Sequence, residues 1–191
     1  MIRIVTDSTS DVPESLVREL DIVVVPTYVI FGAQAYVDGV TISRQEFYER
    51  LASANPLPTT AAPGAGEFEN AYRRLQQAGA QAVVSIHVAA RLSGVQNAAR
   101  AGASAVPELP VTVFDSEQVT MGLGWQVIEA ARAARAGMSV AEIIELLARV
   151  RQRVRVFAAL DTSGFTSVPW SGFESHVNPI STPRSSGRMS R

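Results

Sequence analysis

Short apolar runs alternate with helical segments along the first 160 residues of this 191-residue chain, and this alternation restricts the fold more than any other feature. Amphipathic segments of helical length lie between the apolar runs. Strands separated by helices in this way pair in parallel, through right-handed crossovers. We therefore predict an α/β domain over residues 1–162, with a parallel sheet flanked by helices on both faces. The expected strands are residues 2–5, 22–25, 82–88, 111–114 and 154–160.

Several of the expected helices have recognisable ends. The Ser-x-x-Glu patterns that begin at Ser43 and Ser139 predict two capping boxes, each opening a helix. Phe68, Tyr72 and Leu75 recur at helical spacing and indicate one buried face, on a helix that ends before a glycine. That helix is expected at residues 66–78, and further helices are expected at residues 13–20, 93–105 and 118–136.

Composition excludes several classes of function. The formal net charge is −1, with 17 basic and 18 acidic residues, so the chain lacks the concentrated basic surface that nucleic acid requires. It has no cysteine for disulfides or thiolate sites, and its two histidines argue against a histidine-based metal site. No apolar run approaches the roughly 20 residues that span a bilayer. With no leader sequence at Met1, we expect a cytoplasmic protein without a transmembrane segment.

The segment 163–191 breaks the alternation. It contains eight serines, three prolines and three glycines, and its aromatic residues show no sustained period. Such composition is typical of irregular or disordered chain. We therefore expect two parts: the α/β domain over 1–162 and an irregular tail over 163–191.

Polar loops directly follow three of the apolar runs: residues 6–11, 93–94 and 115–116. The carboxyl ends of parallel strands face one side, so we expect these loops to meet at one crevice. Asp7, Ser8, Asp115 and Ser116 either line that crevice or order its loops, and for Asp115 the loop-ordering role is the preferred interpretation.

His87 and the arginines at residues 149–155 are interpreted as structural and not as functional residues. His87 falls within an apolar strand, which favours a packed role over a catalytic one. The arginines at residues 149–155 fit a solvated helix face.

Ser93 occupies the expected start of a helix. There its hydroxyl and the free N–H groups of the first turn would both face an anion. The alternative is that Ser93 only caps the helix.

The motifs taken together resemble the DegV family over residues 1–162. Each is short, but their order and spacing all agree. They are IVTDSTSD at 4–11, VP at 25–26, YVDG at 36–39, PTTAAP at 58–63, LSG at 92–94, and DS at 115–116 with MGLG at 121–124.

The resemblance implies a bacterial protein that binds a long-chain fatty acid between two α/β domains. It places the acid's carboxylate against Thr59, Thr60, Ser93 and the backbone of Gly94, with no catalytic residue, metal or further cofactor. Some family members present the acid to a fatty acid kinase, which is therefore an expected partner. The loop at 58–63 lacks the family's Ser and Gln. Beyond residue 162 the family's second domain is largely missing, as in a truncated chain.

Two other functions remain open from the sequence. The first is a hydrolase or phosphotransfer enzyme with Ser93 or Ser8 as nucleophile, although the sequence contains neither a Gly-x-Ser-x-Gly elbow nor a phosphate-binding glycine loop. The second is a truncated chain without function. We also expect Thr59 or Thr60 to lie near Ser93 at the carboxyl edge of the parallel sheet, where one anion would bridge them.

Overall fold

The computed structural model describes residues 1–157, and their centre is a parallel sheet, called sheet A below. Its strands pair in the order β2-β1-β6-β7, and all three pairings are parallel. The predicted parallel sheet is therefore confirmed. The bounds are β1 Ile2–Asp7, β2 Val23–Val25, β6 Ala82–His87 and β7 Val111–Asp115.

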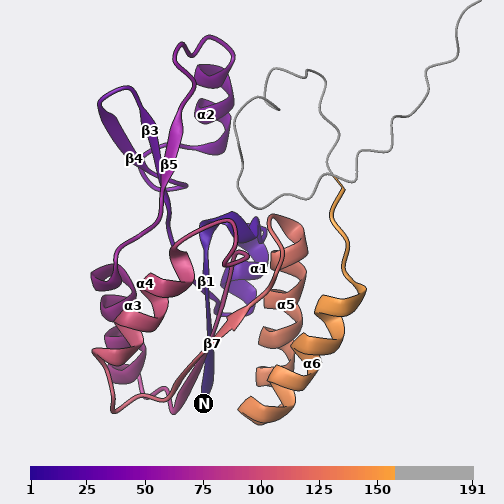
Figure 1. The fold of residues 1–191 in the computed structure, drawn as a ribbon. Helices are drawn as coiled ribbons and strands as arrows, with labels where there is room; N and C mark the ends of the chain where they lie inside the picture. The colour runs from indigo at the N-terminus through magenta and orange to yellow at the C-terminus, as the bar shows by residue number, and fades with distance from the viewer. Residues whose placement is uncertain (158–191) are drawn as a thin grey trace, which may run out of the picture. The chain divides into compact units, whose positions relative to one another are not determined.

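Helices cover both faces of sheet A, as predicted (Figure 1). One face carries α3 (Ala65–Gln77) and α4 (Val95–Ser104). The other carries α5 (Met121–Arg135) and α6 (Val140–Arg153), with α1 (Glu14–Glu19) on the same side. The core lies between these layers and the sheet. The predicted buried face of α3 is confirmed, because Phe68, Tyr72 and Leu75 are its buried residues.

A second sheet, called sheet B below, was not predicted. It consists of β3 (Tyr28–Phe31), β4 (Gln34–Val37) and β5 (Thr59–Ala61), paired antiparallel in the order β4-β3-β5. Gly32 turns the β3–β4 hairpin with a φ of 59°, a left-handed conformation that glycine adopts without strain. The ring of Phe31 packs edge-on against Tyr36 and against Phe47 of α2 (Arg44–Leu51). Strands of three or four residues are too short to show a clear alternation in sequence.

The predicted starts of α5 and α2 differ in detail from the structure. Helix α5 begins at Met121, not at residue 118, because Glu117 and Thr120 have φ values of 53°, which a right-handed helix does not accommodate. At α2 only half of the capping box forms: Ser43 accepts a hydrogen bond from the backbone of Glu46, whose carboxylate pairs with Arg50 instead.

The second capping box, at Ser139 and Glu142, is complete. Residues 154–157 form no strand. The rest of the predicted last strand, the boundary at residue 162 and the segment 163–191 lie outside the described residues.

Candidate functional site

The carboxyl edge of sheet A brings together three polar residues that end neighbouring strands. Asp7 ends β1, His87 ends β6 and Asp115 ends β7. Val5 is paired with Ser85, which places Asp7 level with His87, and His87 is itself paired with Asp115. The polar loops identified in the sequence therefore leave the sheet from adjacent positions.

Asp7 and His87 form a pair that is fully buried. His87 Nδ1 lies 2.9 Å from Asp7 Oδ2, and the backbone N–H of Val88 donates to the same oxygen at 3.2 Å. Thr9 donates to the other carboxylate oxygen through both its backbone N–H, at 3.1 Å, and its hydroxyl. The carboxylate thus holds the ends of β1 and β6 together and shapes the loop after β1.

The hydrogen bonds continue from His87 into the core. His87 Nε2 lies 2.7 Å from Ser85 Oγ, which lies 2.8 Å from the hydroxyl of Tyr72. In one arrangement of the protons, neutral His87 donates from Nδ1 to Asp7. Ser85 then donates to His87 Nε2, and Tyr72 donates to Ser85, so every proton has an acceptor. Burial raises the pKa of Tyr72 to about 12, although the hydrogen bond with Ser85 opposes this rise, so the phenol keeps its proton at neutral pH.

Ser85, His87 and Asp7 have the connectivity of a catalytic triad. All three are 0% exposed, so no substrate reaches the Ser85 hydroxyl. The two serines that the sequence offered as nucleophiles bond elsewhere: Ser8 to Thr27, and Ser93 to the backbone of Val95. The arrangement accordingly serves to order the edge of sheet A. Sequence reasoning missed the Asp7–His87 pair, whose members are 80 residues apart, although both end strands now known to be adjacent.

Asp7 makes the fold sensitive to acid. Burial raises the pKa of its carboxyl, but the contacts with His87, Thr9 and Val88 together lower it below the ordinary value of 3.8. A carboxylate whose pKa is lowered by folding stabilises the fold above its ordinary pKa, and this stabilisation is lost as the pH falls through the lower, folded-state value.

We expect the Asp7 ¹³Cγ resonance to titrate with a midpoint below 3.8. The free energy of unfolding should also decrease as the pH falls below about 4. An NMR titration of the folded protein measures the midpoint directly, and a midpoint above 3.8 would contradict the expectation.

The other predicted crevice residues order loops. Ser8 Oγ accepts from the backbone N–H of Thr27 at 3.1 Å and so ties the loop after β1 to the segment that enters sheet B. Asp115 accepts from the backbone N–H of Glu117 at 2.9 Å, and Ser116 donates to the carbonyl of His87 at 2.7 Å. Asp7 and Ser116 are 0% exposed, which favours the loop-ordering alternative for these two residues. Ser8 and Asp115 are half-buried.

Arg151 is a second contributor that the sequence did not reveal. Its guanidinium donates to the carbonyl of Asp115 at 2.9 Å, pairs with Glu117 at 2.9 Å and lies over the ring of Phe114. These contacts fasten α6 to the loop after β7. Arg151 was predicted to lie on a solvated helix face, but in the structure it is half-buried and has a structural role.

The predicted anion-binding residues lie on two different elements. Thr59 and Thr60 are exposed on β5 of sheet B, paired with Ile30 and Val29, and so belong to sheet B and not to the edge of sheet A. Ser93 is half-buried and Gly94 exposed, immediately before α4. Among residues 1–157, the Ser93 hydroxyl accepts only a long 3.4 Å bond from Val95, so the predicted Ser93 cap is weak. That the threonines and Ser93 share one anion stays a prediction.

The sequence of the chain can be compared with those of known proteins. The sequence model described as "Uncharacterised protein, DegV family" matches residues 1–165. The chain belongs to the DegV family. A DegV domain-containing protein of Deinococcus radiodurans is 39% identical over 164 residues, which are 86% of this chain and 58% of the relative. The chain therefore spans somewhat more than half the length of that DegV relative.

Solved structures of DegV proteins share the fold. A fatty-acid-binding DegV family protein from Thermus thermophilus has a TM-score of 0.73 at 34% identity, covering 79% of this chain and 53% of that one. DegV from Bacillus subtilis, described as a fatty acid binding protein, has a TM-score of 0.75 at 32% identity, covering 79% and 54%. Of the helices in residues 1–157, none has both the length and the apolarity needed to cross a bilayer.

Proposed function

We propose that this chain supplies the carboxylate-holding part of a fatty-acid site, formed by Thr59, Thr60, Ser93 and Gly94. The observation that carries the proposal is the match of fold and sequence to DegV proteins described as fatty-acid-binding. Two local features support it: both threonines are exposed, and within the described part of the chain the Ser93 hydroxyl has only one long hydrogen bond. The hydroxyls therefore remain available to an anion, whereas at the start of α4 the N–H groups of Val95 and Asn97 already donate to Ser93 Oγ and to the carbonyl of Gly94.

We propose that the chain binds the fatty acid without catalysing a reaction on it, and the buried hydrogen-bond network supports this. Asp7 and His87 are occupied with each other and closed to solvent. A carboxylate held between exposed threonines and the start of α4 would lie near solvent, where a fatty acid kinase could reach it. Presentation to such a kinase is part of the proposal.

We expect weak binding by a polypeptide of these 191 residues alone, because they span about half the length of the DegV relatives. Each buried CH₂ contributes about 0.8 kcal/mol. If half of a sixteen-carbon chain stays in water, roughly 5–6 kcal/mol is lost, a factor of several thousand in affinity.

A titration with palmitate tests the proposal, with palmitate methyl ester as the uncharged comparison. Ser93→Ala should weaken palmitate binding by about 10- to 100-fold, since a hydrogen bond to a charged group contributes about 1.5–3 kcal/mol. It should leave binding of the ester unchanged. Ser104→Ala, whose hydroxyl bonds within α4, is the matched control. Equal binding of acid and ester, or no effect of Ser93→Ala, would contradict the proposed site.

A further inference from the structure

Strand β2 is an open edge of sheet A. Within residues 1–157 its only strand partner is β1, so its other side carries backbone groups that a further strand can pair with. Its sequence is Val23-Val24-Val25, without a charged residue. Charges, bulges, covering elements, prolines and short length are the common protections of edge strands. Strand β2 lacks charge, but it has three residues and is followed by Pro26, so it favours only a short pairing with another chain.

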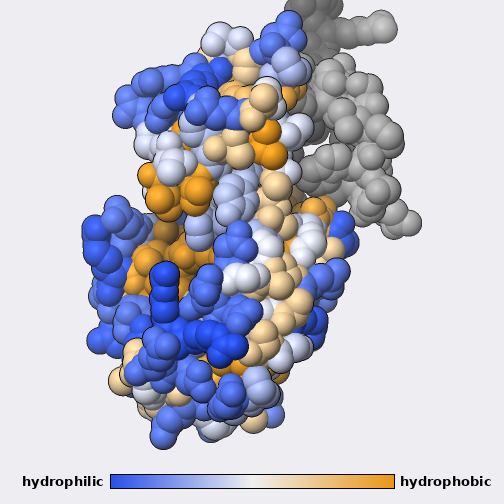
Figure 2. All heavy atoms as spheres, turned by 90° about the vertical axis from the view of Figure 1, so that its left-hand side faces the viewer, coloured by the Kyte–Doolittle hydropathy of each residue, from blue (hydrophilic) through white to orange (hydrophobic). Residues whose placement is uncertain are grey.

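A groove of about 430 Å³ lies beside this edge, between β2 and α3, and is called the β2 groove below. Its floor is apolar, formed by Val23, Val25 and Leu75. Figure 2 shows an apolar hollow, bordered by hydrophilic side chains, on the side of the molecule that carries α3. The β2 groove thus offers apolar surface directly next to unpaired backbone.

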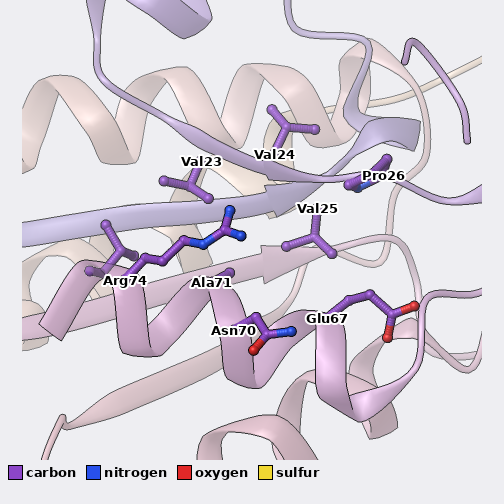
Figure 3. Close-up of a pocket in the computed structure, with 9 residues that line it drawn as sticks. Val23, Val24, Val25, Pro26, Glu67, Asn70, Ala71 and Arg74 are labelled. Atoms are coloured by element: carbon purple, nitrogen blue, oxygen red, sulfur yellow. The ribbon is translucent and has the colours of Figure 1, made fainter. Parts of the chain in front are cut away.

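Opposite charges mark the two ends of the β2 groove. Helix α3 runs against the direction of β2, so Glu67 lies at the Pro26 end and Arg74 at the Val23 end (Figure 3). Both side chains are exposed. Glu67 accepts from Tyr28 at 2.8 Å, whereas the guanidinium of Arg74 has no hydrogen-bond or ion-pair partner among the residues that the structure describes.

We propose that the β2 groove binds a second copy of this chain, with the two β2 strands antiparallel about a twofold axis. In that arrangement Val23 faces the partner's Val25, and both α3 helices lie on one face of the joined sheet. The Arg74 end of each groove then meets the Glu67 end of the other, so the ion pair forms twice. Parallel pairing about a twofold axis would instead place the two α3 helices on opposite faces of the joined sheet, where neither ion pair forms.

The strength expected for this dimer is low. A three-residue strand provides few hydrogen bonds, and exposed ion pairs contribute about 0–1 kcal/mol each. The net charge of −1 gives little overall repulsion between copies. We expect a dissociation constant on the order of 10 μM, typical of small interfaces.

Sedimentation velocity of the full chain over a concentration series tests the proposal. Arg74→Glu and Glu67→Arg should each weaken the dimer about tenfold or more, since each places like charges across the axis. The double variant, which restores opposite charges in exchanged positions, should return to within about threefold of the wild type. Arg149→Glu on the exposed side of α6 makes the same charge change away from the β2 groove and should have no effect.

Two results would overturn the proposal. One is a wild type that stays monomeric up to roughly 500 μM, well above the expected dissociation constant. The other is a dimer that neither single variant weakens, because such a dimer would use a different surface. Far-UV circular dichroism of each variant establishes that the fold is retained, which surface substitutions on α3 should allow.

Discussion

Asp7→Ala is expected to lower the free energy of unfolding by about 3–5 kcal/mol, the usual cost of removing one partner from a buried charged pair. The substitution leaves the N–H groups of His87 and Val88 without an acceptor in a buried site, and it also removes the acceptor of the half-buried Thr9. Each such group costs about 1–3 kcal/mol. Urea unfolding followed by circular dichroism measures the change.

Asp7→Asn should rescue little of this loss, although asparagine has nearly the same size. Its amide nitrogen cannot accept: in one orientation of the amide it faces His87 Nδ1–H and the Val88 N–H, and in the other it faces the Thr9 N–H. If His87 instead shifts its proton to Nε2, Ser85 must donate to Tyr72, and the Tyr72 proton then loses its acceptor. The network is thus satisfied only with a carboxylate at position 7.

Asp115→Asn is the matched control for Asp7→Asn. Asp115 is half-buried, and its main bond is to the backbone N–H of Glu117 two residues on. Asparagine makes the same turn, so the cost should be under about 1 kcal/mol. Equal costs for the two asparagine variants would show that the buried network contributes nothing special to stability.

Gly102→Ala is expected to lower the free energy of unfolding by about 1–3 kcal/mol, as overpacked positions do. A Cβ at Gly102 on α4 would lie 2.7 Å from Phe68 Cβ, 2.8 Å from the carbonyl oxygen of Ala65 and 2.8 Å from the backbone nitrogen of Glu69. Two of these atoms are backbone, so α3 and α4 must move apart. This cost outweighs the gain of up to about 1 kcal/mol from the better helix propensity of alanine.

Gly66→Ala is the control, and it is expected to raise the free energy of unfolding, whereas Gly102→Ala lowers it. Gly66 lies on α3, and a Cβ there would meet nothing within 4 Å. The substitution should therefore stabilise the protein by about 0.4–1 kcal/mol. Chemical unfolding of both variants under one set of conditions compares them, and a stabilising Gly102→Ala would show that the two helices separate without cost.

Part of the candidate site could be predicted from the sequence, because the patterns that indicate it lie within a few residues of the site residues. Ser93 precedes a helix, and Asp7 directly follows an apolar run, both as predicted. The partners of these residues are not local. Nothing near Asp7 in sequence indicates His87, and nothing near Arg151 indicates the loop after β7, because those contacts depend on which strands and helices become neighbours.

The sequence by itself determined the parallel sheet A, its covering helices and the buried face of α3, because apolar periodicity is set residue by residue and decides which side chains leave water. Tertiary structure alone decided three things: the order β2-β1-β6-β7, the sheet B that carries Thr59 and Thr60, and the burial of the Asp7–His87 pair. A polar side chain is functional or structural according to whether solvent reaches it. That depends on how distant segments pack, which no local pattern records.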